Sequence, residues 1–178
     1  MSDAARTGPT SALVPVAQLA EDLGLSPGTR PDPPGVVVVD CRFNLMKPAA
    51  GRADWLAGHI PGAFYADLDR DLAGPASPAT GRHPLPDPER LRVLFSSFGI
   101  GPETRVVAYD DGPGAIAARL WWLLRWMGHR HAALLDGGLA AWRAAGLPLA
   151  TDAPAPVPGR SFTGQPGAMP PRDTAKLA

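Results

Sequence analysis

Three short apolar runs constrain the fold of this chain more than any other feature. They are VVVVD (36–40), VVAYD (106–110) and AALLD (132–136). Because each run is uninterrupted by polar residues, it predicts a strand buried on both faces, as in a parallel sheet. Helix-like segments lie between the runs, near residues 14–24, 53–59, 87–99, 115–129 and 139–146, and a short strand is expected near 63–65. Strands that alternate with helices predict an α/β domain with a central, mostly parallel sheet covered by helices on both faces.

Composition limits the class of protein further. The 178 residues are 45% hydrophobic and 19% charged, with a formal net charge of zero, which excludes wholesale disorder and gives no electrostatic basis for binding nucleic acid. No apolar run approaches ~18 residues, so no membrane span is expected. The 22 prolines cluster in loops and tails. We therefore expect a disordered tail over 1–12, one domain over 13–150, and a Pro-rich linker or truncated C-terminal tail over 151–178.

The cysteine and histidine content argues against disulfides and metal sites. Cys41 is the single cysteine, which excludes an intrachain disulfide or a cysteine cluster and is typical of a reducing compartment. The N-terminus lacks the pattern of a signal peptide, so a cytoplasmic location is expected. The histidines have no spacing that supports a metal; they are His59, His83, His129 and His131. We expect neither a metal nor another cofactor.

The loop that follows VVAYD is the first candidate site. Its sequence GPGAIA (112–117) matches the dinucleotide pattern G-x-G-x-x-A, follows a strand and opens a helix, and Asp136 ends the next strand. Asp110 and Asp111 argue against that hypothesis, because they would place negative charge beside a pyrophosphate. The loop remains a candidate cradle for an anion or a nucleophile.

Two residues after the first apolar run are also candidate nucleophiles. Asp40 ends a buried strand, which is the position of the aspartate nucleophile in haloacid-dehalogenase-like phosphatases. Those phosphatases need a second acid two residues later, where this chain has Arg42. Cys41 follows a strand without a glycine-rich loop to lower its pKa, so a buried structural thiol is the favoured interpretation. A phosphatase motif C-x5-R is absent at both Cys41 and the loop.

Several stretches together resemble the rhodanese-like sulfurtransferases. GHIPGA (58–63) and DGGLAAW (136–142) resemble the two hallmarks of that family. The stretches VVVVDCRF (36–43), GPASPATGRHPLPDPERL (74–91) and VVAYDDGPGAIAARLWWLLRWMGH (106–129) resemble the N-terminal half of two-domain thiosulfate and 3-mercaptopyruvate sulfurtransferases. The resemblance covers residues 14–163 and implies a rhodanese-like fold. It also implies sulfane sulfur transfer from thiosulfate or 3-mercaptopyruvate to a thiophilic acceptor as the activity of the parent enzyme.

The resemblance also implies where the family's cysteine would stand. That cysteine begins a C-x-x-G-x-x-A/S loop, and matched to this chain it falls on Asp111, with Gly112, Pro113, Gly114, Ala115 and Ile116 as the active-site-like loop. A carboxylate cannot carry sulfur, so no catalytic residue is assigned and the chain is expected to be inactive alone, as the N-terminal half. Its partner would be a catalytic second rhodanese domain, absent from this chain, with Arg42 and Phe43 as the candidate interdomain face.

A stand-alone, non-catalytic protein-binding module is the alternative. In that case Asp111 would lie at a helix N-terminus, where a carboxylate is favourable, and would fill its own cradle as a built-in anion. The sequence leaves open whether the chain is a fragment, a truncated product or a single-domain protein. It also leaves open the donor, the acceptor and the oligomeric state.

Overall fold

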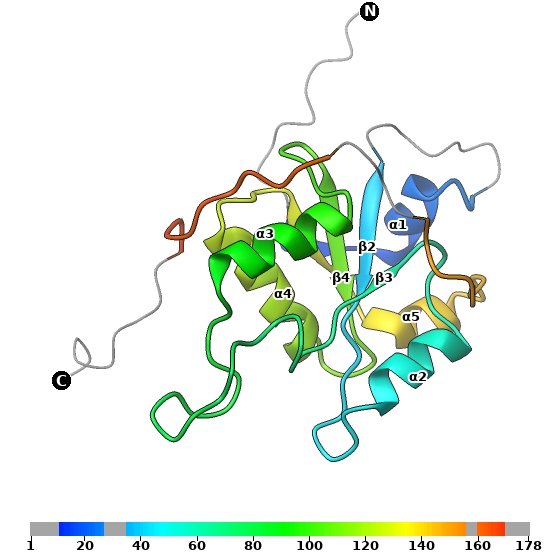
Figure 1. The fold of residues 1–178 in the computed structure, drawn as a ribbon. Coiled ribbons are helices and arrows are strands. Elements are labelled where there is room, and N and C mark those ends of the chain that lie inside the picture. Colours follow the sequence, from blue (N-terminus) through cyan, green and yellow to red (C-terminus); the bar gives the residue numbers. More distant parts are fainter. Residues whose placement is uncertain (1–10, 27–34, 156–159, 170–178) are drawn as a thin grey trace, which may run out of the picture.

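A five-stranded, all-parallel sheet forms the centre of the molecule in the computed structural model, which describes residues 11–26, 35–155 and 160–169. The strands lie in the order β1-β5-β4-β2-β3 and the helices lie on both sides (Figure 1). Along the chain the elements are β1 (Leu13–Val14), α1 (Val16–Asp22), β2 (Val36–Asp40), α2 (Ala50–Ala57), β3 (Phe64–Tyr65), α3 (Pro88–Ser97), β4 (Arg105–Tyr109), α4 (Ala115–Trp126), β5 (Ala132–Leu135) and α5 (Gly138–Ala144). The predicted α/β class and parallel sheet are confirmed.

Side-chain alternation along the central strands divides the core into two layers. Val37 and Val39 of β2 face a core shared with α3 and α4, whereas Val38 faces a core shared with α1 and α5. Figure 1 shows α3 and α4 on one side of the sheet and α1 and α5 on the other. Both faces of β2 are thus covered, which is the reason its sequence is apolar without interruption.

Local signals set the ends of the helices. The Asp87 side chain caps α3 by accepting hydrogen bonds from the backbone N–H groups of Glu89 and Arg90, and Pro88 occupies the first helical position. At α4, Gly114 provides the N-cap with a φ of 87°, a conformation that favours glycine. None of the helices in the described part of the chain is long and apolar enough to cross a membrane.

Two features of the chain ends were not expected from the sequence. β1 is a two-residue strand that pairs in parallel with β5, in the register Leu13 to Leu134. Residues 160–169 return to the domain, where the buried Phe162 ring packs edge-on against Phe95 of α3. Residues 1–10 of the predicted tail, and residues 156–159 and 170–178 of the predicted C-terminal segment, lie outside the described residues. In the described part of that segment, Phe162 is buried in the core.

Candidate functional site

The loops that follow β2, β4 and β5 meet at the carboxyl edge of the sheet, where sites of parallel sheets form. Asp40 at the end of β2 pairs in register with Tyr109 at the end of β4. The Leu139 N–H at the start of α5 donates to the Asp110 carbonyl at 3.0 Å. The active-site-like loop is therefore held at this edge by both of its neighbours.

The side chain of Asp110 occupies the centre of that loop. One carboxylate oxygen accepts from the backbone N–H groups of Gly112 and Gly114, and the other accepts from Ile116 and Ala117, all at 3.0 Å. The residue is only 3% exposed. The loop is thus an anion cradle at the N-terminus of α4, and its anion is a carboxylate of the same chain.

Asp111 has a different position. It is exposed, whereas the alternative of a stand-alone binding module expected it to fill the cradle. That expectation was wrong about which aspartate does so, because the chain turns at the end of β4 and directs the first aspartate toward the loop amides. The assignment of Asp111 to the family's cysteine position stays a prediction.

The second hallmark, DGG, explains how the loop is confined. Gly137 and Gly138 have φ values of 72° and 55°, which favour glycine. A Cβ atom on Gly138 would lie 2.5 Å from the carbonyl oxygen of Asp110. The glycine therefore lets the chain after β5 approach the backbone of the cradle.

A buried polar network joins the first hallmark, GHIPGA, to the strand ends. The Arg42 guanidinium donates to both carboxylate oxygens of Asp40 and, at 2.7 Å, to the Gly58 carbonyl. The Tyr109 hydroxyl donates to Asp40 at 2.7 Å and accepts from the Ile60 N–H at 3.1 Å. Burial, and secondly the Asp40 charge, raises the pKa of Tyr109. Every member has a partner, so the network holds this edge rigid.

This network decides the roles of two residues that the sequence analysis singled out. Asp40 is fully buried and paired, which suits a structural carboxylate rather than a nucleophile. Arg42 is 3% exposed and committed to that pair, so its guanidinium is not available at the surface. Phe43, the other candidate for an interdomain face, is half-buried.

Cys41 is fully buried and unsuited to nucleophilic chemistry. Its exposed fraction is zero. Burial, and secondly the charges of Asp40 and Asp110, raises the pKa of its thiol well above 9.0. A thiol held protonated is a poor nucleophile, because the thiolate is the reactive form.

His59 also has a structural role. Its ring stacks on Trp55 with centroids 4.5 Å apart, and its ring nitrogens lie 2.7 Å from the Trp55 carbonyl and 3.1 Å from that of Asp152. It thus joins α2 to the segment after α5. No group of three His, Cys, Asp or Glu residues that could hold a metal occurs in the described ranges.

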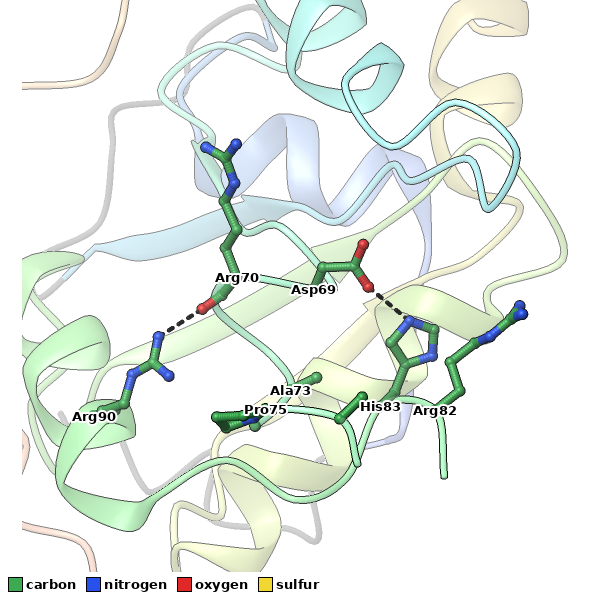
Figure 2. A pocket seen from close by; sticks show the side chains of 9 residues that line it. Asp69, Arg70, Ala73, Pro75, Arg82, His83 and Arg90 are labelled. Carbon is green, nitrogen blue, oxygen red and sulfur yellow. Dashed lines mark hydrogen bonds and ion pairs between the residues drawn. The ribbon is translucent and has the colours of Figure 1, made fainter. Parts of the chain in front are cut away.

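A second polar site, which the sequence analysis missed, lies in the long loop between β3 and α3. A pocket of about 380 Å³ is lined by Arg70, Arg82, Arg90, Asp69 and His83, with small residues between them. Figure 2 shows the His83 imidazole facing Asp69, and the side chains of Arg70 and Arg82 extending away from that pair. The His83 Nε2 atom lies 2.8 Å from Asp69 Oδ1. The Phe43 ring is edge-on to His83, with centroids 6.2 Å apart.

This arrangement has the chemistry of an oriented imidazole in a cationic pocket. A carboxylate that fixes one ring nitrogen of a histidine leaves the other free to exchange a proton with a reactant. The 14-residue separation of Asp69 and His83 crosses a loop rich in proline and glycine, so no periodicity links them. In the sequence, His83 stands out only as one of four histidines without metal-binding spacing.

Comparisons with known proteins give the family. The model of the rhodanese-like domain family matches residues 29–145. A probable 3-mercaptopyruvate sulfurtransferase of Pseudomonas aeruginosa is 51% identical over 146 residues, which are 81% of this chain and 51% of that protein. A putative thiosulfate sulfurtransferase of Mycobacterium tuberculosis is 40% identical over 124 residues, covering 70% of this chain and 43% of that protein.

Solved structures agree with the sequence relatives. SseA from Escherichia coli, described as a 3-mercaptopyruvate sulfotransferase, superimposes with a TM-score of 0.75 at 28% identity, covering 94% of this chain and 60% of that chain. The 3-mercaptopyruvate sulfurtransferase from Leishmania major gives 0.74 at 30% identity, covering 91% and 42%. This chain spans about half the length of the curated relatives it matches. The protein belongs to the rhodanese-like domain family.

Proposed function

We propose that this chain is the non-catalytic N-terminal half of a two-domain sulfurtransferase that moves sulfane sulfur from thiosulfate or 3-mercaptopyruvate to a thiophilic acceptor. The observation that carries the proposal is the Asp110 carboxylate, which occupies the cradle and accepts four backbone N–H bonds. A sulfur carrier in this loop would need a thiolate at that point. The single cysteine, Cys41, is fully buried next to the end of β2, and burial raises the pKa of its thiol.

The pocket between β3 and α3 supports a positive contribution to the shared reaction. Three arginines against one carboxylate give it an excess of positive charge, which attracts anionic donors such as thiosulfate or a mercapto acid. When a thiolate takes sulfur from 3-mercaptopyruvate, an S–S bond forms, the C–S bond breaks and the pyruvate enolate takes up a proton. The imidazole of His83, oriented by Asp69, is suited to deliver that proton.

The loop after β2 supports docking of a catalytic second domain. Leu45 and Met46 are 55% and 88% exposed, although apolar, and they directly follow Phe43 and Asn44. Phe43 contacts His83, so this apolar surface and the cationic pocket are continuous. A second domain seated here would bury the apolar side chains and face the pocket. A cytoplasmic location belongs to the same proposal, because an unpaired thiol is typical of a reducing compartment.

Activity assays on the 178-residue polypeptide test the proposal. Neither thiosulfate with cyanide nor 3-mercaptopyruvate with a thiol should give turnover, and Cys41→Ser should change nothing. Turnover that Cys41→Ser abolishes would overturn the proposal. Sequencing the coding region past Ala178 tests the second half: a rhodanese-like domain with a C-x-x-G loop supports the two-domain enzyme, and its absence favours the stand-alone binding module.

Two cysteine variants test which aspartate stands at the family's cysteine position. Asp110→Cys places a thiol where the four amides converge, so its pKa should fall to about 7 or below, as for other thiols at helix N-termini. Asp111→Cys places it on the exposed side of the loop. The rate of alkylation by iodoacetamide against pH measures both pKa values. A lower pKa for the Asp111→Cys thiol would restore the original assignment.

A further inference from the structure

The guanidinium of Arg119 joins α4 to the loop that carries His83. Its Nε donates to the Leu72 carbonyl at 3.2 Å, and its Nη2 donates to the carbonyls of His83 and Pro84, both at 3.0 Å. All three acceptors are backbone atoms of one loop. Within the described residues, no ion pair between Arg119 and a carboxylate is found.

The backbone at His83 is in a conformation that needs such support. His83 has a φ of 55° and is the single non-glycine residue with positive φ in the described part of the chain. It also precedes Pro84, and a residue before proline favours extended backbone. A conformation of this kind costs about 1–3 kcal/mol and persists only where the surroundings enforce it. The Arg119 guanidinium donates to the carbonyl oxygens of both His83 and Pro84, and these hydrogen bonds fix the backbone on either side of the peptide bond between the two residues.

Burial makes this use of an arginine unusual. Arg119 is half-buried, and burial lowers the pKa of its guanidinium. A cation partly removed from water without a carboxylate partner is unfavourable unless its donors are satisfied. Here the Nε and Nη2 donors are satisfied by carbonyls of the loop that brings His83 to Asp69. The same helix begins at the Asp110 cradle, so α4 supports both polar sites.

We propose that Arg119 is a positioning residue that holds the His83 imidazole against Asp69 in the cationic pocket. The significance of this pair for sulfur transfer rests on the proposed function, but the placement of the imidazole does not. Without the Arg119 bonds, the His83–Pro84 backbone would relax to extended geometry and carry the imidazole away from Asp69. The effect should be local, because the sheet and the Asp110 cradle are held by other contacts.

Imidazole NMR of the 178-residue polypeptide tests the proposal without an activity assay. The His83 Nε2–H proton, bonded to Asp69, should exchange slowly with water in the unmodified protein. Asp69→Ala removes the acceptor and provides the spectrum of an unpaired His83. Arg119→Gln should move the His83 nitrogen and proton shifts toward that spectrum and accelerate Nε2–H exchange by about ten-fold or more, as for the loss of a hydrogen bond to a charged group.

Two further variants separate positioning from general stability. Arg125→Gln lies on the same helix and removes a guanidinium that donates to the Arg130 carbonyl, so the His83 signals should stay unchanged. Arg119→Lys keeps the charge and one donor group, so it should give His83 shifts between those of wild type and Arg119→Gln. It also serves as the test variant if Arg119→Gln does not fold.

The outcomes overturn the proposal at separate points. If Asp69→Ala leaves the His83 signals in place, the pair does not form in solution. If Asp69→Ala moves them but folded Arg119 variants do not, the positioning role is wrong while the pair stands. Neither result depends on whether the polypeptide or a longer enzyme transfers sulfur, so failure of the proposed function is recognised independently.

Discussion

Removing the Asp110 carboxylate is the most direct test of how the active-site-like loop is built. The substitution Asp110→Ala deletes the acceptor of four backbone N–H groups, all 3.0 Å from its two oxygens. Nothing else in the loop replaces it, because the neighbouring Asp111 is exposed. The four donors would then have to be hydrated or left without partners.

The expected loss follows from the number and type of these bonds. A hydrogen bond to a charged group contributes about 1.5–3 kcal/mol, so simple addition would give about 6–12 kcal/mol. That sum is too high, because bonds that share one carboxylate are not independent and water can enter from the exposed side of the loop. We expect Asp110→Ala to lower the free energy of unfolding by about 3–5 kcal/mol, because each unpaired N–H donor costs about 1–3 kcal/mol and water replaces part of the lost bonding.

Urea unfolding followed by tryptophan fluorescence measures this loss. Asp111→Ala is the matched control, since it removes the same charge one residue away at an exposed position. It should cost at most about 1 kcal/mol, the value of a carboxylate near a helix N-terminus. Equal unfolding midpoints for the two variants would refute the assignment of Asp110 as the bound anion.

An added oxyanion should partly restore the Asp110→Ala protein. The emptied cradle would keep its N–H groups directed inward, and a ligand that binds only the folded state stabilises it by RT ln(1 + [L]/Kd). Sulfate stabilises proteins generally, so the relevant quantity is the gain of Asp110→Ala beyond the gains of wild type and Asp111→Ala in the same buffer. An extra gain of about 1–3 kcal/mol in saturating sulfate would fit an open cradle. No extra gain would indicate that the loop collapses without its carboxylate.

Three further substitutions test the buried parts of the domain. Burial raises the folded-state pKa of Cys41 above 9.0, so the unfolded chain loses the thiol proton first and the free energy of unfolding should fall as pH rises above 9.0. Cys41→Ala should reduce this dependence of the free energy of unfolding on pH, measured by urea titrations at several pH values. Arg42→Met strands the fully buried Asp40 carboxylate and should cost about 3–5 kcal/mol by urea unfolding, whereas a loss below about 1 kcal/mol would contradict the buried pair. Phe162→Ala removes a ring packed on Phe95 and should cost about 3–5 kcal/mol by calorimetry; an unchanged Tm would place residues 160–169 outside the folded unit.

The sheet was predictable because its central strands carry an unmistakable signal. β2 and β4 are buried on both faces, so their sequences contain no polar interruption and exclude an amphipathic alternative. β1 was not predictable, because two residues that pair with β5 carry no periodicity of their own. Phe162 likewise lies among prolines and glycines, and its burial depends on contacts with α3, which are distant in sequence.

The candidate site was predictable only in part. The pattern of glycines located the cradle, because close backbone approach leaves a recognisable mark in the sequence. It could not choose between Asp110 and Asp111, since one residue of register at the end of β4 reverses which side chain points inward. The Asp69–His83 pair was out of reach, because the fold of an irregular loop and the Arg119 contacts bring it together.

The Asp110 carboxylate already occupies the groups of the loop that an incoming anion would need. An incoming anion would have to displace a carboxylate that is covalently tethered to the loop and already makes four hydrogen bonds. Because the tether fixes the carboxylate beside the amides, its effective concentration far exceeds that of a free donor. The loop therefore has the N–H groups that form an anion site, but the Asp110 carboxylate already occupies that site. Its hydrogen bonds hold the start of α4, and Arg119 of that helix in turn holds the loop that lines the cationic pocket with His83.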